Sequence, residues 1–261
     1  FINFIDKTPS LGKTFVCIDD KNVREVIKKT NSKNFYTYGF TKGANFQITS
    51  PKQKENYSEF NLKINIPGIK NEIKKIKVPI IGFHNIRNSA SCVAISFLIG
   101  VNIKIIKSGL ISFKGVERRF NFLFERNNAL FFDDYAHHPT EISSVLDGVK
   151  DVYKKKEIVC VFQPHRISRV KNLKNEFSKS FKKADTVILC PIYKASENIK
   201  LGYSYESFAK LIIKNSKVNL IKVENELGLR KLIKQTGYGE KIYIGMGAGT
   251  ISGWMKNLIT V

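Results

Sequence analysis

The spacing of hydrophobic and polar positions along this 261-residue chain changes near residue 112. Before that point, short runs that partly alternate between apolar and polar residues are punctuated by Gly43, Pro51 and Pro67-Gly68, which is typical of an antiparallel meander. The predicted strands are 15–18, 36–40, 45–49, 59–66 and 73–80, and the predicted helices are 22–29, 85–98 and 103–111.

After residue 112, short apolar runs alternate with stretches in which apolar residues recur at helical spacing. Five such strand–helix units predict a parallel, doubly wound sheet. The predicted strands are 129–132, 158–162, 186–190, 218–223 and 241–244, and the predicted helices are 139–153, 170–181, 204–214, 226–234 and 250–259. We therefore predict an α/β protein with two domains, 1–112 and 113–261.

The formal net charge of +22 invites a nucleic-acid or membrane-surface interpretation. Lysine is scattered over every segment, however, alongside abundant Asn and Ile, which indicates the composition of an AT-rich genome rather than a binding patch. The sequence contains neither a recognised RNA or DNA motif nor an apolar run of about 18 residues. We predict no specific nucleic-acid partner and no membrane span.

The four cysteines, Cys17, Cys92, Cys160 and Cys190, form no C-x-x-C pair and have no zinc spacing. Each lies in an apolar stretch, so we predict buried, reduced thiols in a cytosolic protein and no metal site in this chain. The chain begins with Phe1 rather than Met, and we expect it to be a piece of a longer polypeptide.

Two glycine motifs suggest nucleotide binding only weakly. Leu11-Gly12-Lys13-Thr14 resembles the end of a phosphate-binding loop, but the earlier glycine is replaced by Lys7 and a strand follows, which favours a simple turn. Residues 245–249 (Gly-Met-Gly-Ala-Gly) resemble a dinucleotide fingerprint without its last glycine or its acidic partner. That turn either approaches an anion through backbone amides or only packs.

Polar side chains follow two consecutive predicted strands. The first group contains two carboxylates at the end of the strand, two imidazoles in the loop and a third carboxylate at the start of the helix, and the second contains an imidazole and two guanidinium groups, which suit hydroxyl groups, metals or anionic substrates. A helix cap with solvated loop residues is the alternative for the first group, and basic surface for the second. The first group is Asp133, Asp134, Tyr135, His137, His138 and Glu141, and the second is His165, Arg166 and Arg169.

Two further groups lie earlier in the chain. Asn85 and Asn88 are three positions apart on a predicted helix, where both amides could bind the edge of an adenine, although the motif taken alone favours a helix cap at Asn85. Arg118 and Arg119 are adjacent and close to the domain boundary, where they could reach phosphates as the domains close, or merely form surface charge.

Together these segments resemble the Mur ligase family, and within it the member that joins L-alanine to UDP-N-acetylmuramate in peptidoglycan synthesis. The similarity spans nearly the whole chain, and its specific parts are the aspartate–tyrosine–histidine and Gln-Pro-His-Arg segments. The matching segments are 1–4, 37–40, His84-Asn85-x-x-Asn88, 118–120, 133–141, 162–166 and 247–249.

The resemblance implies the later part of a central ATP-binding domain followed by a Rossmann-like C-terminal domain. It implies an ATP- and Mg²⁺-dependent, amide-forming ligase of the bacterial cytoplasm that acts through an acyl phosphate, with the main metal ligands, the phosphate loop and the uridine site upstream of Phe1. The implied roles are adenine binding by His84, Asn85 and Asn88, ribose binding by Asp134, catalysis by Arg118, Arg119 and His137, and substrate binding by Tyr135, His138, His165, Arg166 and Arg169.

Two positions depart from the family pattern, Ile167 and Lys194, where an aromatic residue and a proline are usual. The missing phosphate loop leads us to expect that this piece does not turn over alone. Three alternatives stay open: the recycling ligase that attaches a whole tripeptide to the same sugar nucleotide, a basic nucleic-acid-binding module, and a non-catalytic ligand-binding remnant.

Overall fold

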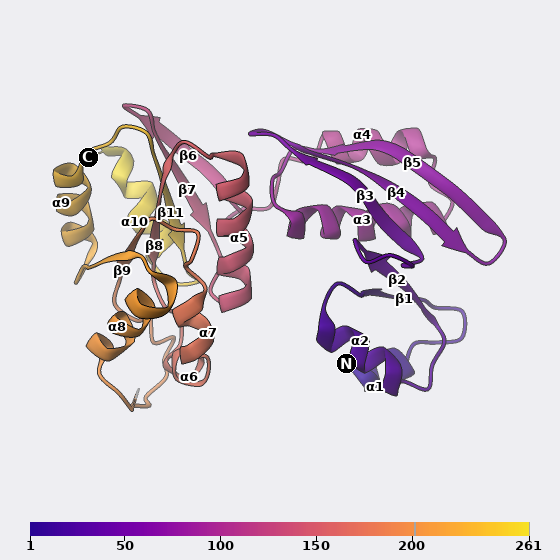
Figure 1. Cartoon of the computed structure of the whole chain (residues 1–261), viewed down its shortest axis with the longest axis horizontal. Helices are drawn as coiled ribbons and strands as arrows, with labels where there is room; N and C mark the ends of the chain where they lie inside the picture. Colours follow the sequence, from indigo (N-terminus) through magenta and orange to yellow (C-terminus); the bar gives the residue numbers. More distant parts are fainter. Residues whose placement is uncertain (201, 261) are drawn as a thin grey trace. The chain divides into compact units, whose positions relative to one another are not determined.

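The computed structural model describes residues 1–200 and 202–260. The chain divides into two compact units, Phe1–Lys114 and Gly115–Val261, so that the division lies two residues after the end of the predicted first domain. Figure 1 shows the helices and strands of both units.

The first unit contains a five-stranded sheet in the order β1-β2-β3-β4-β5. Its longest helix, α3, and helix α4 pack on one face of this sheet, where apolar side chains of both helices join the buried strand residues in one core. The strands are β1 (Thr14–Cys17), β2 (Phe35–Gly39), β3 (Phe46–Gln53), β4 (Ser58–Ile66) and β5 (Ile69–Val78), and the helices are α1 (Ile2–Asp6), α2 (Lys21–Lys29), α3 (Phe83–Leu98) and α4 (Ile103–Ile111).

The predicted antiparallel meander is confirmed for β3, β4 and β5 and is wrong for β2. Strand β2 pairs in parallel with both β1 and β3. Parallel neighbours usually need a long crossover, but here Tyr38 at the end of β2 lies beside Phe46 at the start of β3. Because the two strands are offset in this way, a six-residue link is long enough.

The second unit contains a six-stranded sheet in the order β10-β9-β8-β11-β7-β6. The five predicted strand–helix units are confirmed, and their five strands run parallel. The strands are β6 (Asn121–Arg126), β7 (Ala129–Asp134), β8 (Glu157–Phe162), β9 (Thr186–Leu189), β10 (Asn219–Lys222) and β11 (Lys241–Met246). The helices are α5 (Pro139–Val152), α6 (Ile167–Asn172), α7 (Lys174–Lys179), α8 (Tyr205–Ser216), α9 (Glu226–Thr236) and α10 (Ile251–Asn257).

Helices cover both faces of this sheet (Figure 1). Leu229 of α9 and Met255 of α10 belong to the core on one face, together with Phe131 and Val161. On the other face, the ring of Phe162 packs against Phe177 and Phe181. Two-sided covering explains why β8, β9 and β11 read as continuous apolar runs rather than alternating ones.

Three details differ from the predictions, two in the second unit and one among the cysteines of the chain. Strand β6 was not predicted, and it pairs antiparallel with β7, so this sheet is mixed. The single helix predicted over 170–181 is two short helices that meet at Leu173. Cys160 and Cys190 are buried as predicted, but Cys17 is only partly buried and Cys92 is exposed on α3, because its position on the helix faces away from the sheet. Among the described residues, no helix is long and apolar enough to cross a membrane.

Candidate active site

The parallel strands of the second unit end at the same level. Met246 at the end of β11 pairs with Asp134 of β7 on one side and with Phe162 of β8 on the other, and Phe162 pairs with Leu189 of β9. The loops that follow these strands therefore leave the sheet from one edge. In a doubly wound sheet, this is the edge at which ligands bind.

At the end of β7, two adjacent carboxylates are buried. Ser252 Oγ donates a hydrogen bond to Asp133 Oδ2 over 2.6 Å. Asp134, whose exposed fraction is 2%, accepts hydrogen bonds from the backbone N–H groups of Phe120 and Ala136 over 2.8 and 2.7 Å. Burial raises the pKa of Asp134 to about 6, although the two N–H donors act in the opposite direction. This carboxyl organises the surrounding loops, and its contact with a ribose stays a prediction.

The next residues fix two imidazoles in opposite ways. His137 Nδ1 lies 2.8 Å from the carbonyl oxygen of Tyr135, which can only accept, so Nδ1 carries the proton and Nε2 of the neutral ring is an acceptor. His138 is the N-cap of α5, and its Nδ1 accepts a hydrogen bond from the N–H of Thr140 over 3.3 Å. The predicted helix-cap interpretation therefore holds for His138, whose substrate contact stays a prediction.

Glu141 completes the cap from inside α5. Its Oε2 accepts hydrogen bonds from the N–H groups of His137 and His138 over 3.0 and 3.2 Å, which closes a capping box. The loop that carries both imidazoles is thus held at its backbone, while the rings remain at the strand-end edge.

The two adjacent arginines differ in their surroundings. Arg118 is mostly buried: its Nη2 donates to the carbonyl oxygen of Gly247 over 2.6 Å, and its Nε lies 3.6 Å from Asp133 Oδ2. The Arg119 side chain is 49% exposed and lies 3.9 Å from Glu141 and 5.8 Å from the centre of the Tyr135 ring. Arg119 is therefore the arginine whose charge is available to an anion, whereas Arg118 ties loops together.

The loop after β8 carries the second predicted group. The Arg169 Nη1 atom lies 3.2 Å from both Nδ1 and the carbonyl oxygen of His165. The ring of His165 also approaches that of His137, with the ring centres 5.8 Å apart. The structure thus brings together polar groups from two strand ends. Arg166, exposed and with a positive φ of 69°, begins helix α6.

The glycine turn after β11 is filled by neighbouring side chains. A Cβ at Gly247 would lie 2.6 Å from the backbone oxygen of Gln163, and one at Gly249 would lie 2.5 Å from Gln163 Oε1 and 2.6 Å from Tyr193 Cγ. Gln163 Oε1 also accepts a hydrogen bond from the N–H of Ile251. These contacts favour the packing interpretation of the motif over the dinucleotide one.

In the first unit, the predicted adenine-binding residues lie on the first turns of α3. The predicted cap at Asn85 is wrong, because the helix begins two residues earlier and its N-cap is Gly82, with a φ of 101°. The Asn85 Nδ2 atom instead donates to the carbonyl oxygen of Ile81 over 2.7 Å. Asn88 is exposed one turn further on, and His84 packs its ring against Gly82. Residues 11–14 form a turn into β1, as predicted.

Beside α3, an ion pair lies that sequence reasoning missed. Arg87 Nε donates to Asp19 Oδ2 over 2.7 Å, and Asp19 also accepts hydrogen bonds from the N–H groups of Phe40 and Thr41. Burial pushes the pKa of Asp19 upward, but Arg87 and these donors together hold it below its ordinary value. This network joins the start of α3 to the end of β1.

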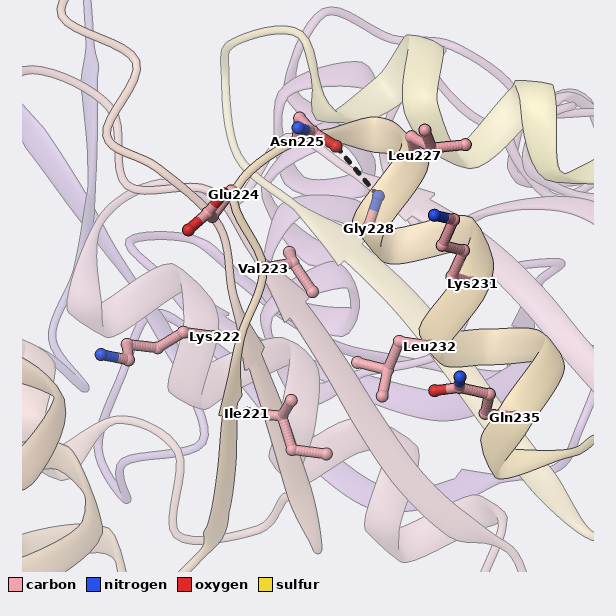
Figure 2. A pocket seen from close by; sticks show the side chains of 10 residues that line it. All are labelled: Ile221, Lys222, Val223, Glu224, Asn225, Leu227, Gly228, Lys231, Leu232 and Gln235. Carbon is pink, nitrogen blue, oxygen red and sulfur yellow. Dashed lines mark hydrogen bonds between the residues drawn. The ribbon is translucent and has the colours of Figure 1, made fainter.

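A hollow of about 510 Å³ lies elsewhere on the second unit, between the edge strand β10 and helix α9. Figure 2 shows Ile221 and Val223 from the strand side and Leu232 from the helix side facing it, with Lys222 pointing away. The residues predicted to carry chemistry line no part of this hollow.

The described residues hold no group of three or more His, Cys, Asp or Glu side chains that could bind a metal ion. Sequence reasoning assigned no role to three polar residues at the strand-end edge, Gln163, Tyr193 and Glu197, although Gln163 belongs to the Gln-Pro-His-Arg segment that carries the resemblance.

Models of two domains match this chain. The Mur ligase middle domain matches residues 1–96, and the Mur ligase glutamate ligase domain matches residues 118–248. An α/β architecture with its polar groups at one sheet edge is thus accompanied by matches over most of both units. The chain belongs to the Mur ligase family.

Curated relatives include the UDP-N-acetylmuramate–L-alanine ligase of Pelagibacter ubique, which is 58% identical over 99% of this chain and 56% of that protein. The enzyme of the same name from Brachyspira hyodysenteriae is 38% identical over 96% of this chain and 53% of that protein. The chain spans about half the length of the curated relatives it matches.

Solved structures share the fold. The UDP-N-acetylmuramate–alanine ligase of Thermotoga maritima matches with a TM-score of 0.68 at 24% identity, over 91% of this chain and 54% of that one. A murein peptide ligase from Psychrobacter arcticus matches with a TM-score of 0.69 at 19% identity, over 100% of this chain and 53% of that one.

Proposed function

We propose that the protein to which this chain belongs joins L-alanine to UDP-N-acetylmuramate in an ATP-dependent reaction. The observation that carries this proposal is the 58% identity to the ligase of that name over 99% of the chain. The polar groups gathered at the strand ends of the second unit support it, because they offer both anion-binding and proton-accepting atoms.

The proposed reaction has two steps. A carboxylate oxygen of the sugar nucleotide attacks the γ-phosphorus of ATP, which forms an acyl phosphate and releases ADP. The amine of L-alanine then attacks the acyl carbon, which forms the amide, releases inorganic phosphate and frees a proton. Bound Mg²⁺ would neutralise charge on the phosphates.

Residues of the second unit would serve the second step. His137 suits the amine, since its Nε2 lacks a proton in the neutral ring and can accept one. Arg119, with its half-exposed side chain, suits the charge that develops on phosphate, and Arg118 would act with it from a more buried position. Tyr135, His138, His165, Arg166 and Arg169 would shape the place of the substrates.

Residues of the first unit would bind the nucleotide base. Asn88 is exposed, and the amide oxygen of Asn85 remains available while its nitrogen is bonded to Ile81. An amide offers an adenine both a donor and an acceptor, and His84 adds an aromatic ring beside them. In the second unit, Asp134 would contact the ribose. Because ATP is the co-substrate, we place the enzyme in the bacterial cytoplasm.

The test is an assay of phosphate release by the product of the complete reading frame, supplied with ATP, UDP-N-acetylmuramate and an acceptor. We expect turnover with L-alanine and little with the L-alanine-containing tripeptide. A preference for the tripeptide would establish the recycling ligase instead. Phosphate release that ignores every acceptor, or a reading frame without a phosphate loop, would favour the non-catalytic remnant.

Two controls sharpen this assay. The 261-residue chain alone contains no complete phosphate-loop motif, so we expect it to release no phosphate, and normal activity would contradict that expectation. Binding to DNA no tighter than that of an unrelated polycation would remove the nucleic-acid alternative, whereas tight binding with a steep salt dependence would support it.

A further inference from the structure

The loop that follows β9 is bonded directly to the loop that follows β8. The N–H of Arg166 donates to the carbonyl oxygen of Tyr193, and the N–H of Tyr193 donates to that of Pro164, each over 2.8 Å. His165 and Tyr193 thereby form an isolated parallel bridge beyond the ends of the strands. Neither Tyr193 nor any other residue of its loop belongs to the predicted site.

The same loop also holds the start of helix α6. Glu197 accepts hydrogen bonds from Ser168 at two points: the Ser168 N–H lies 2.9 Å from Oε2, and the Ser168 hydroxyl lies 2.5 Å from Oε1. These bonds to Ser168 hold the pKa of Glu197 below its ordinary value, so the carboxylate stays charged near neutral pH. Because Arg169 is the next residue along, Glu197 fixes the turn that carries it.

Tyr193 also fixes the ring of His165. The two rings are stacked, with their centres 5.5 Å apart and their planes within 9° of each other. Gly249 also lies close to the tyrosine, and a Cβ atom there would come within 2.6 Å of Tyr193 Cγ. The tyrosine, which is 39% exposed, therefore contacts both the glycine turn and the imidazole.

The hydrogen bond between Arg169 and His165 decides where the imidazole proton lies. A guanidinium group has no acceptor, so Arg169 Nη1 donates and His165 Nδ1 accepts over 3.2 Å. The remaining proton of the neutral ring is on Nε2. Burial lowers the pKa of His165, and the positive charge of Arg169 lowers it further, so the ring is neutral near pH 7.

We propose that Tyr193 and Glu197 are positioning residues that hold His165 as a neutral imidazole whose Nε2–H donates a hydrogen bond to the anionic part of the substrate. The assignment rests on the proposed function for the identity of that substrate, but not for the state of the ring. It gives the neighbouring imidazoles opposite tasks, since the contact of Nδ1 with a carbonyl oxygen makes Nε2 the acceptor in the neutral form of His137, whereas Nε2 carries the proton in His165.

This arrangement suits an α-amino acid at the moment of reaction. A carboxylate only accepts hydrogen bonds, so the Nε2–H of His165 suits it, with Arg166 and Arg169 supplying positive charge. An amine that loses a proton needs an acceptor, which His137 offers. His165 is a poor general base here, because its Nδ1 is engaged by Arg169 and its Nε2 already carries the proton.

Nitrogen-15 NMR of the 261-residue chain tests the state of the ring directly. Long-range proton–nitrogen correlations distinguish the two neutral tautomers and the charged ring, and the chain has only four histidines to assign. We expect His165 in the Nε2–H form and His137 in the Nδ1–H form. A charged His165, or one protonated on Nδ1, would overturn the proposal whatever reaction the protein catalyses.

Matched variants test the two positioning residues. Tyr193→Phe keeps the stacked ring and should keep the His165 signal, whereas Tyr193→Leu should shift it toward an average of the two tautomers. Glu197→Gln should keep the His165 signal of the parent protein, whereas Glu197→Ala should change it. Lys194→Ala, at an exposed side chain in the same loop, is the control. An unchanged signal in both Tyr193→Leu and Glu197→Ala would refute the positioning role.

Kinetics of the complete protein then separate this proposal from the proposed function. Tyr193→Leu should raise the KM for L-alanine about 2- to 10-fold with kcat little changed, and Tyr193→Phe should restore it. If L-alanine is not a substrate at all, the proposed function fails while the NMR result stands. If the KM is unchanged in a folded Tyr193→Leu variant, the positioning proposal fails while the function stands.

Discussion

The two sheets of this chain bury their strands differently. In the first unit, β4 alternates buried residues with partly or fully exposed ones along its whole length, because helices cover one face of the sheet. In the second unit, five of the six residues of β8 are buried in succession, because helices cover both faces. The comparison shows that polar chemistry in the second sheet can lie only at the strand ends, whereas the first sheet has room for it along an entire face.

The largest expected difference concerns the middle of each sheet. Phe162→Ala removes a ring that is fully buried on β8, so the free energy of unfolding should fall by about 3–5 kcal/mol. Lys63→Ala on the exposed face of β4 should change it by less than about 0.5 kcal/mol. Urea denaturation followed by far-UV circular dichroism measures both. A comparable loss in the two variants would contradict the one-sided covering of the first sheet.

A second difference is the sign of the pH dependence of each unit. Asp134 of the second unit has a pKa of about 6 against 3.8 in the unfolded chain, so the folded protein holds a proton that the unfolded chain releases. The free energy of unfolding should therefore fall as the pH rises from about 4 to about 6, by up to roughly 3 kcal/mol, and then level off. The fluorescence of Trp254, the single tryptophan, reports on this unit.

The first unit should respond in the opposite direction. The pKa of Asp19 is held below its ordinary value of 3.8, so the stability it contributes is present above that value and is lost as the pH falls through the folded pKa. Asp134→Asn should flatten the slope between about pH 4 and 6, and Asp19→Asn should leave that slope intact. Hydrogen exchange of β4 amides measures the first unit. If the Asp134→Asn variant keeps the same pH dependence of stability, a group other than Asp134 must cause it.

Much of this contrast could be read from the sequence, because the period of apolar residues reports how many faces of a strand are covered. Strand β6 was not predicted because it lies at the sheet edge. Phe122 is 56% exposed there, and the apolar pattern of the strand resembles that of a loop. The break at Leu173 has no Gly or Pro to announce it. The parallel pairing of β2 depends on an offset that a short link does not reveal.

The strand pattern also predicted where the candidate site lies, but not the contacts within it. His137, His165 and Arg169 follow buried strands that end at one level, so the strand pattern alone brings them to one edge. The partners that fix their protons were not predictable, because Tyr193 reaches His165 from a third strand end by backbone contacts. Asn85 was misread because the start of α3 depends on the positive φ of Gly82.

A smaller effect concerns the glycine turn that packs against the site. Gly249→Ala would bring a Cβ within 2.6 Å of Gln163 and Tyr193, so we expect a loss of about 1–3 kcal/mol in the free energy of unfolding. Gly253→Ala is the matched control on helix α10, since open space surrounds that position, and it should stabilise the unit by up to about 1 kcal/mol. Thermal unfolding of both variants, followed by Trp254, measures this. An equal change in stability in the two variants would mean that side chains do not fill the space at Gly249.

The smallest expected effect lies on α3 of the first unit. Asn85→Ala removes the hydrogen bond to Ile81 and should cost about 1 kcal/mol, whereas Asn88→Ala at an exposed position should change stability by less than about 0.5 kcal/mol. If both amides contact adenine, both variants should weaken ATP binding by the complete protein, measured by calorimetry. Undiminished affinity in Asn88→Ala would remove that residue from the nucleotide site.

Because the parallel strands end at a common level, the loops at the two ends of the sheet in the second unit should tolerate insertions and deletions differently. One added residue near Phe162 would turn the following side chains to the opposite face and separate loops that are bonded to one another. At the other edge, the turn that includes Lys154 and Lys155 is exposed, and it connects α5 to β8 away from the polar groups. Length changes should accumulate there across homologues, and an inserted tag or label is best placed at the same turn.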